Sequence, residues 1–370
     1  MIRIDEIYYN IFLPVVKKLP FHSIHWFDPF GSTNFNDICS QPVVSSALQN
    51  RFQLTSNHAC RRILFWDQEP LHKELIDITL PEFIKKFNTG KIYIVSSERD
   101  SENVEYVCNN YDVGALYYFF HGWAALDWYR GYNRTFLIAP PEQRNPTKTF
   151  IAPNRIIAGK RQHRLEMLYW IFKLGLTDNH ISCPTICPAE NVSIYDSVKV
   201  LPFDDAEQVF QNATLPMQFK NETDHPMHSC WLSLFDESAD SLLYLVTETV
   251  ADGRRHHLTE KTFKPIALGM PFVLAATTGS LEYLRSYGFK TFGHLWDESY
   301  DTIEDPHERI KAVASLLSRL HDLSAKERNE IHRAAIPTIE HNYNHFYNGG
   351  FEKILWDELQ GMLDHVKSGL

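Results

Sequence analysis

The chain has 370 residues, 44% hydrophobic and 13% aromatic, which is enough to bury the cores of two ordinary domains. A formal net charge of −10 excludes a general attraction to nucleic acid or anionic lipid, so any polyanion needs a local basic patch. No basic start followed by an apolar stretch opens the chain, and no window approaches the roughly 18 apolar residues of a membrane span. These features predict a globular, cytoplasmic protein.

The first 150 residues alternate between short apolar runs and segments with helical periodicity. The apolar runs are rich in aromatic and β-branched residues, as are the buried strands of parallel sheets. This alternation predicts an α/β domain over residues 1–150. Strands are expected at 63–70, 91–98 and 115–122, with helices at 70–87 and 101–112 between them.

A segment rich in Pro, Asn and Thr, residues 139–154, predicts an interdomain linker. A second α/β domain is expected over 151–345, followed by a C-terminal helix over 346–370. Together the two halves predict two Rossmann-like domains with a ligand cleft between them, at the carboxyl ends of the strands. Strands are expected at 192–203, 242–249, 271–276 and 290–293, and helices at 161–178, 259–269, 278–288, 305–320 and 351–366.

Residues 245–274 are the most informative segment, because Thr259, Glu260 and Lys261 open a helix that leads into a buried strand. Thr259 is a suitable N-cap, and the backbone N–H groups of a helix start attract anions. Lys261 can add a point charge for a diphosphate, and Glu260 can accept hydrogen bonds from ribose or sugar hydroxyls. The alternative is an ordinary capped helix with a solvated Glu-Lys pair.

A basic cluster opens the predicted helix at 161–178. Arg155, Lys160, Arg161, His163 and Arg164 all lie between the end of a predicted strand and the first turn of that helix. Cations at a helix start oppose the macrodipole, so their presence favours a bound phosphate. The alternative is a solvated basic surface.

Two residues of the first half are candidates for acid–base chemistry. Glu69 follows the apolar run in FWDQEPL (65–71), and a carboxylate at the carboxyl end of a buried strand suits a general base. His121, in YYFFHGW, is the second catalytic candidate. The alternative for His121 is a hydrogen-bonded core histidine.

Several common motifs are missing from the chain. The absence of Asp-x-Asp predicts no metal–carboxylate clamp on a diphosphate, and six thinly scattered cysteines predict neither disulfides nor structural zinc. No GxxxxGK[ST], GxGxxG or GxSxG occurs, so P-loop enzymes, dinucleotide dehydrogenases and serine hydrolases lose their usual support. A transferase that neutralises its leaving group with Arg and Lys fits what is left.

Five stretches resemble a family of phage and bacterial glycosyltransferases, over most of residues 60–345. They are ILFWDQEPL, YFFHGWAALDWYRGY, NRIIAGKRQHRLEML, TETVADGRRHHLTEKTFKPIALGMPFVL and GSLEYLRSYGFKTFGHLWDESYDTIEDPHERI. More distantly, LTEKTFKPIALGMPFVL is similar to the TEK donor-site motif of α-1,3-fucosyltransferases, which are metal-independent, inverting enzymes of the two-domain GT-B fold that use a GDP-sugar. The Phe-Glu-Asn run upstream of that motif is replaced here by VTETVADG (246–253), so the resemblance does not fix the sugar or nucleotide.

The resemblance implies roles for individual residues. Glu260 and Lys261 match the Glu-Lys pair that contacts ribose and diphosphate, and Arg164 matches an arginine that binds the diphosphate. Glu69 falls near the carboxylate that acts as general base. The complete set of expected donor-binding residues is Asn154, Arg155, Lys160, Arg164, Thr247, Glu248, Thr259, Glu260 and Lys261.

The expected activity is an inverting, metal-independent transfer of a sugar from a nucleotide sugar to a hydroxyl, in the host cytoplasm if the protein is phage-borne. The acceptor is open between a hydroxymethylated base of phage DNA and a glycan or protein. A loop expected to be exposed, Arg254-Arg255-His256-His257, mildly favours an anionic ligand. The alternative is a non-catalytic nucleotide-sugar-binding or assembly module with the same fold.

Overall fold

The computed structural model describes residues 22–26, 61–86, 91–132, 138–188, 191–219 and 231–368, together with Arg3, Ile7 and Ile11. It is an α/β protein with two parallel sheets and C-terminal helices. Tertiary contacts divide the chain into two units, each described by itself below. Unit 1 comprises Met1–Asp127, Gly253–His257 and Glu352–Leu370, and unit 2 comprises Trp128–Asp252 and Leu258–Phe351.

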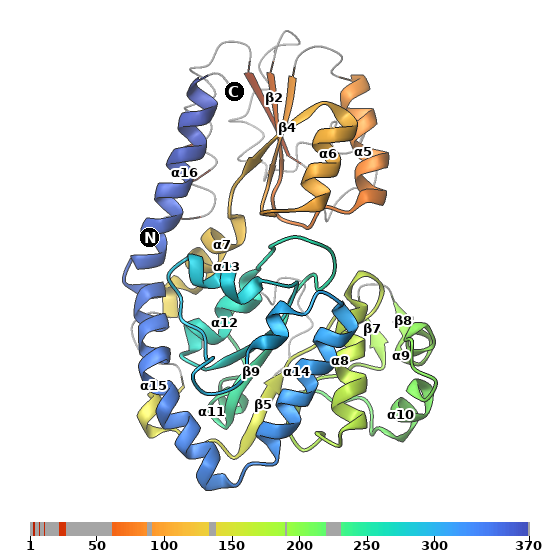
Figure 1. The fold of residues 1–370 in the computed structure, drawn as a ribbon, viewed down its shortest axis with the longest axis vertical. Helices are drawn as coiled ribbons and strands as arrows, with labels where there is room; N and C mark the ends of the chain where they lie inside the picture. Colours follow the sequence, from red (N-terminus) through yellow and green to blue (C-terminus); the bar gives the residue numbers. More distant parts are fainter. Residues whose placement is uncertain are drawn as a thin grey trace. The chain divides into compact units, whose positions relative to one another are not determined.

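Unit 1 is built on a four-stranded parallel sheet with the strand order β1-β2-β3-β4. Helix α6 begins where the Ser101 side chain accepts hydrogen bonds from the N–H groups of Asn103 and Val104, and it ends at Asp112 in the left-handed conformation. Helices α5 and α6 pack together beside the sheet (Figure 1). The elements are β1 His22–Trp26, β2 Arg61–Trp66, α5 Lys73–Lys86, β3 Lys91–Ser96, α6 Glu102–Tyr111, β4 Val113–Tyr117 and α7 Phe120–Tyr129.

The core of unit 1 forms between the strands and these helices. Leu64 and Trp66 of β2 and Ile94 of β3 pack in one buried cluster with Phe83 of α5 and Val107 of α6. Burying such side chains contributes roughly 1.5–3 kcal/mol each. The near-continuous apolar runs of β2 and β3 are therefore strands of a covered parallel sheet, as the sequence predicts.

Unit 2 contains the second parallel sheet, with the strand order β10-β9-β5-β6. Helices α8 and α14 lie side by side, and α14 packs on β5 and β10 (Figure 1). Helix α12 packs on β9 and on α15. The bounds are β5 Lys148–Ala152, α8 Gln162–Lys173, β6 His180–Ile181, β9 Ser241–Thr247, α12 Glu260–Leu268, β10 Phe272–Ala275, α14 Pro306–His321 and α15 Ala325–Tyr347.

No helix in the described part of the chain is both long enough and apolar enough to cross a membrane. The remaining elements are mostly short. They are η2 Arg130–Tyr132, η3 Pro141–Gln143, η4 Gly159–Arg161, β7 Ile186–Cys187, β8 Val192–Ser193, α9 Ile194–Ser197, η5 Val198–Val200, α10 Ala206–Asn212, α11 Phe235–Ala239, α13 Ser280–Ser286, η7 Ser299–Thr302 and the C-terminal α16 Gly350–Ser368.

Two predicted strands are wrong. In 192–203 only the two residues of β8 form a strand, because the Ser193 side chain accepts the N–H of Tyr195 and starts α9. No strand forms at 290–293, where the N–H groups of Lys290 and Phe292 donate to the side chains of Asn342 and Glu298 instead of to a neighbouring strand.

The segment expected to be a linker, 139–154, is packed within unit 2. It contains β5, the strand between β9 and β6, and the Arg144 guanidinium donates to the carbonyls of Leu268 and Gly269. The first crossing between the units therefore falls at Asp127/Trp128, and not at the expected position 150/151. Most of α16 groups with unit 1 instead of forming a separate tail.

Candidate functional site

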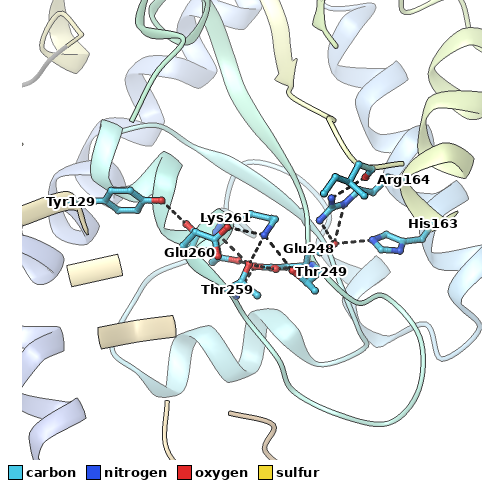
Figure 2. A network of polar contacts seen from close by, with 10 residues as sticks. Tyr129, His163, Arg164, Glu248, Thr249, Thr259, Glu260 and Lys261 are labelled. Carbon is cyan, nitrogen blue, oxygen red and sulfur yellow. Dashed lines mark hydrogen bonds and ion pairs between the residues drawn. The ribbon is translucent and has the colours of Figure 1, made fainter. Parts of the chain in front are cut away.

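The predicted donor residues of unit 2 centre on Glu248, the first residue after β9. Its side chain is fully buried, and its carboxylate accepts four hydrogen bonds. Oε1 accepts from the N–H of Thr259 at 2.9 Å and from Oγ1 of Thr262 at 2.6 Å. Oε2 accepts from the N–H of Thr249 at 2.9 Å and from Oγ1 of Thr259 at 2.6 Å. One carboxylate thus joins the end of β9 to the start of α12 (Figure 2).

The main chain of Glu248 is fixed as firmly as its side chain. Its N–H donates to the carbonyl of Ala275 at the end of β10. Its carbonyl oxygen accepts from Nε and Nη2 of Arg164, at 3.3 and 3.0 Å, and from Nε2 of His163 at 2.8 Å (Figure 2). The first turn of α8 therefore holds the peptide that leaves β9.

The hydrogen-bond partners and the burial of His163 and Arg164 determine their protonation states. A carbonyl only accepts, so Nε2 of His163 carries the proton. Burial and the neighbouring Arg164 lower the pKa of His163 to about 3, so the imidazole is neutral at physiological pH. Burial and Arg161 lower the pKa of Arg164 to about 10, which leaves its guanidinium charged.

The Arg164 guanidinium has donors left over. Nη1 donates to the carbonyl of Ile156 at 3.0 Å, so three of its five N–H groups end on main-chain carbonyls. Within the described ranges Arg164 forms no ion pair with a carboxylate, although Glu248 and Glu260 are near enough to favour its charged form. A buried cation with two further donors suits an anionic ligand.

Lys261 lies in the first turn of α12, where Thr259 caps the helix by accepting the N–H of Lys261. Its Nζ donates to Oγ1 of Thr249 at 3.3 Å, to Oγ1 of Thr259 at 3.4 Å and to Oε1 of Glu260 at 2.8 Å. The Lys261 side chain is 32% exposed, whereas that of Glu260 is 6% exposed. The Glu-Lys pair is therefore formed, but its carboxylate is not solvated. Tyr129 donates to the carbonyl of Glu260 at 3.5 Å (Figure 2).

Asn154 and Thr247 connect the ends of neighbouring strands. Oγ1 of Thr247 donates to Oδ1 of Asn154 at 2.7 Å, and the N–H of Asn154 donates to Oγ of Ser182 at 2.7 Å. Ser182 returns a hydrogen bond to the carbonyl of Asn154 at 3.2 Å. All three residues are buried, and their hydrogen bonds link the carboxyl ends of β9, β5 and β6.

The structure thus brings together Arg164, Thr247, Glu248, Thr259, Glu260, Lys261 and Asn154 through direct contacts. Arg155 and Lys160 lie on the connection between β5 and α8, where Arg155 is half-buried and Lys160 is exposed. The two catalytic candidates belong to unit 1. Glu69 is half-buried just after β2, next to the buried Asp67. His121 is a buried residue of α7.

The surroundings of His121 show that the loop expected to be exposed is partly buried. The imidazole ring of His121 lies edge-on to that of His257, with 5.1 Å between the ring centroids. Both His257 and Arg255 are buried, and Nη1 of Arg255 contacts Oε1 of Glu98 at 3.2 Å. Burial raises the pKa of Glu98 against the effect of Arg255. The expectation of an exposed loop is therefore wrong for Arg255 and His257.

Glu98 and Arg309 are among the buried charged residues that were not singled out from the sequence. Glu98 follows β3 as Asp67 follows β2, so its place at the end of a buried strand was a usable signal. Arg309 of α14 donates to the carbonyls of Ala251, Ala276, Ile303 and Glu304. It occupies an apolar position of its helix, four residues before Val313, which is an unusual place for a cation.

Across the described part of the chain, no group of three or more His, Cys, Asp or Glu side chains is arranged to hold a metal ion. No family model, no curated protein and no solved structure matches the chain.

Proposed function

We propose that this protein is a glycosyltransferase of the two-domain GT-B type, which transfers a sugar from a nucleoside diphosphate to an acceptor hydroxyl. One observation carries the proposal. A partly exposed ammonium, Lys261, lies at the start of a capped helix and is held by hydroxyls and by a buried carboxylate. Hydrogen bonds from Arg164 to the Glu248 carbonyl and from the Thr259 N–H to the Glu248 carboxylate hold the backbone next to Lys261 in place. A helix start with an adjacent cation is suited to a diphosphate.

The proposed roles follow from these contacts. Lys261 exchanges its contacts with Glu260 and with the Thr249 and Thr259 hydroxyls for phosphate oxygens, and the dipole of α12 adds to the attraction. Glu260, freed from Lys261, accepts hydrogen bonds from the ribose hydroxyls. Arg164 contributes a buried positive charge, and Arg155 and Lys160 add cations on the neighbouring connection.

The proposed reaction is a single in-line displacement at the anomeric carbon. The acceptor oxygen forms a bond to that carbon while the bond to the diphosphate oxygen breaks, and the leaving group keeps the electron pair. Side-chain cations stabilise the departing charge. A base takes the acceptor proton; Glu69 is the first candidate because it is accessible to solvent, and the buried His121 is the second. One displacement inverts the anomeric configuration.

A glycan or other neutral acceptor fits the charge of the protein better than duplex DNA. Arg255 and His257 are buried and contribute nothing to a surface patch, and the formal net charge is −10. Binding to duplex DNA depends largely on exposed Lys and Arg. We therefore propose a glycan hydroxyl as the acceptor, and a hydroxymethylated DNA base becomes the competing outcome of the test.

The first test is thermal unfolding with GDP-, UDP-, CMP- and dTDP-sugars in the presence of EDTA, followed by assays of donor hydrolysis. We expect one nucleotide class to raise the melting temperature, and Lys261→Ala to abolish the shift. Lys326→Ala, a strongly exposed lysine of α15, is the matched control and keeps the shift. Stabilisation without turnover on glycan or DNA acceptors would favour a non-catalytic binding module. No shift with any donor would overturn the proposal.

A further inference from the structure

Unit 2 contains a cavity of about 160 Å³ beside the candidate donor site. Its walls come from three segments: Asn154 and Arg155 after β5, residues 182–188 after β6, and residues 217–219. Whole small-molecule sites usually occupy about 300–1,000 Å³, so this cavity has room for part of a ligand only.

The walls are held in place by backbone contacts. The N–H of Cys183 donates to the carbonyl of Met217 at 2.8 Å, and the N–H of Met217 returns a bond to Cys183 at 3.0 Å. On the opposite side, Asn154 and Ser182 are joined by the two hydrogen bonds described above. The cavity is therefore formed before any ligand binds.

The lining suits a flat, nearly neutral group. Pro184, Ile186, Met217 and Phe219 supply apolar surface, and Ile186 is 55% exposed at the rim. Among the residues that the structure describes, the lining contains no carboxylate, and Arg155 is its one charged member. Such a surface favours the faces of an aromatic ring over a phosphate or a bare sugar.

The cavity shares one residue, Asn154, with the candidate donor site. Asn154 lines the cavity and also accepts the hydroxyl of Thr247, the residue directly before Glu248. Along the sheet edge the order is β6, β5, β9, with neighbouring strands about 5 Å apart. A ring bound between the ends of β5 and β6 thus lies roughly one strand spacing from the β9–α12 connection. The ribose and diphosphate attached to that ring would extend towards this connection.

We propose that this cavity binds the base of the donor nucleotide, and that it favours bases with carbonyl oxygens on their edge. The inference rests on the proposed function. Arg155 can only donate hydrogen bonds, so it pairs better with the oxo groups of guanine, uracil, thymine or cytosine than with adenine, which offers ring nitrogens but no oxo group. Apolar walls hold the ring faces, and the Gln218 amide can donate to and accept from its edge.

Calorimetric titration of GDP, UDP, dTDP and ADP tests the proposal. We expect ADP to bind most weakly to the wild type. Ile186→Asp, at the exposed rim, should weaken binding of the preferred diphosphate at least tenfold, and Arg155→Met should reduce the preference over ADP. Val200→Asp is the matched control, because Val200 is 64% exposed in the same subregion but does not line the cavity.

The outcomes separate this inference from the proposed function. If Lys261→Ala weakens every diphosphate while Ile186→Asp and Arg155→Met keep wild-type affinity and preference, the base does not bind in this cavity and the proposed function stands. If the wild type binds no diphosphate, both fail. Melting curves establish that each variant is folded, and Arg155→Met provides the answer if Ile186→Asp is not.

Discussion

The carbonyl oxygen of Glu248 accepts two hydrogen bonds from the guanidinium of Arg164, a residue 84 positions earlier in the chain. Arg164 is therefore part of the scaffold as well as a candidate ligand for phosphate. Arg164→Ala removes three hydrogen bonds to buried carbonyls, and we expect a loss of roughly 2–4 kcal/mol in the free energy of unfolding. Urea unfolding measures it. A loss below about 1 kcal/mol would contradict the structural role of Arg164.

Lys261 should behave in the opposite way. Its side chain is partly exposed and its partners are two hydroxyls and a neighbouring carboxylate, so Lys261→Ala should change the free energy of unfolding by less than about 1 kcal/mol. We expect donor affinity to fall at least tenfold, because the ammonium nearest the helix start is lost. Calorimetry on the variant measures the affinity. Lys261→Arg keeps the charge and should retain more binding than Lys261→Ala.

The Glu248 carboxylate supports a third prediction. All four of its partners are donors, so Glu248→Gln places an amide NH₂ against either the N–H of Thr249 or the N–H of Thr259. We expect a loss of roughly 2–4 kcal/mol in the free energy of unfolding and weaker donor binding, because the start of α12 is displaced. Glu330→Gln, an exposed change on α15, is the control and should be neutral. A neutral Glu248→Gln would show that the four contacts contribute little.

Asp301 predicts a pH dependence of stability. It is buried, its carboxylate accepts the N–H of Leu281, and burial raises its pKa to about 6 from an ordinary value of 3.8. The folded state therefore binds the proton more tightly than the unfolded state does. The stabilisation is complete below about pH 4 and is lost as the pH rises to about 6, a change of about 3 kcal/mol.

The matched variant for this prediction is Asp301→Asn, which keeps an oxygen for Leu281 and does not titrate. Urea unfolding of both proteins from pH 4 to pH 7.5 gives the difference between them. We expect wild-type stability to fall relative to the variant as the pH rises through this range. Parallel curves would mean that Asp301 titrates normally.

Local signals in the sequence predicted the elements that surround the site. Thr259 caps α12 as expected, and the helix expected over 278–288 ends as α13 just before Gly288, which has φ +87°. The strands β2, β3, β9 and β10 could be predicted from their apolar runs, because a strand that is buried on both faces does not alternate between apolar and polar residues. The strand expected at 192–203 does not form, and Val192 and Val200 are exposed instead of lying on the buried face of a strand.

Long-range contacts could not be predicted in the same way. The residue types at 164 and 248 are compatible with many partners, and only the folded chain shows that a guanidinium binds the Glu248 main chain. The burial of Arg255 was hidden for a related reason: its partner Glu98 lies 157 residues away, and a run of four basic residues looks like a surface loop.

The two ends of the connection between β9 and α12 meet on one carboxylate, since Thr249 and Thr259 both donate to Glu248. The spacing of the donor residues is therefore set at the base of this connection, whereas its middle, Gly253–His257, belongs to unit 1, where Arg255 and His257 are buried. A substitution in the middle of this connection can accordingly alter the packing of unit 1, while the hydrogen bonds at the root still hold the start of α12 to the end of β9.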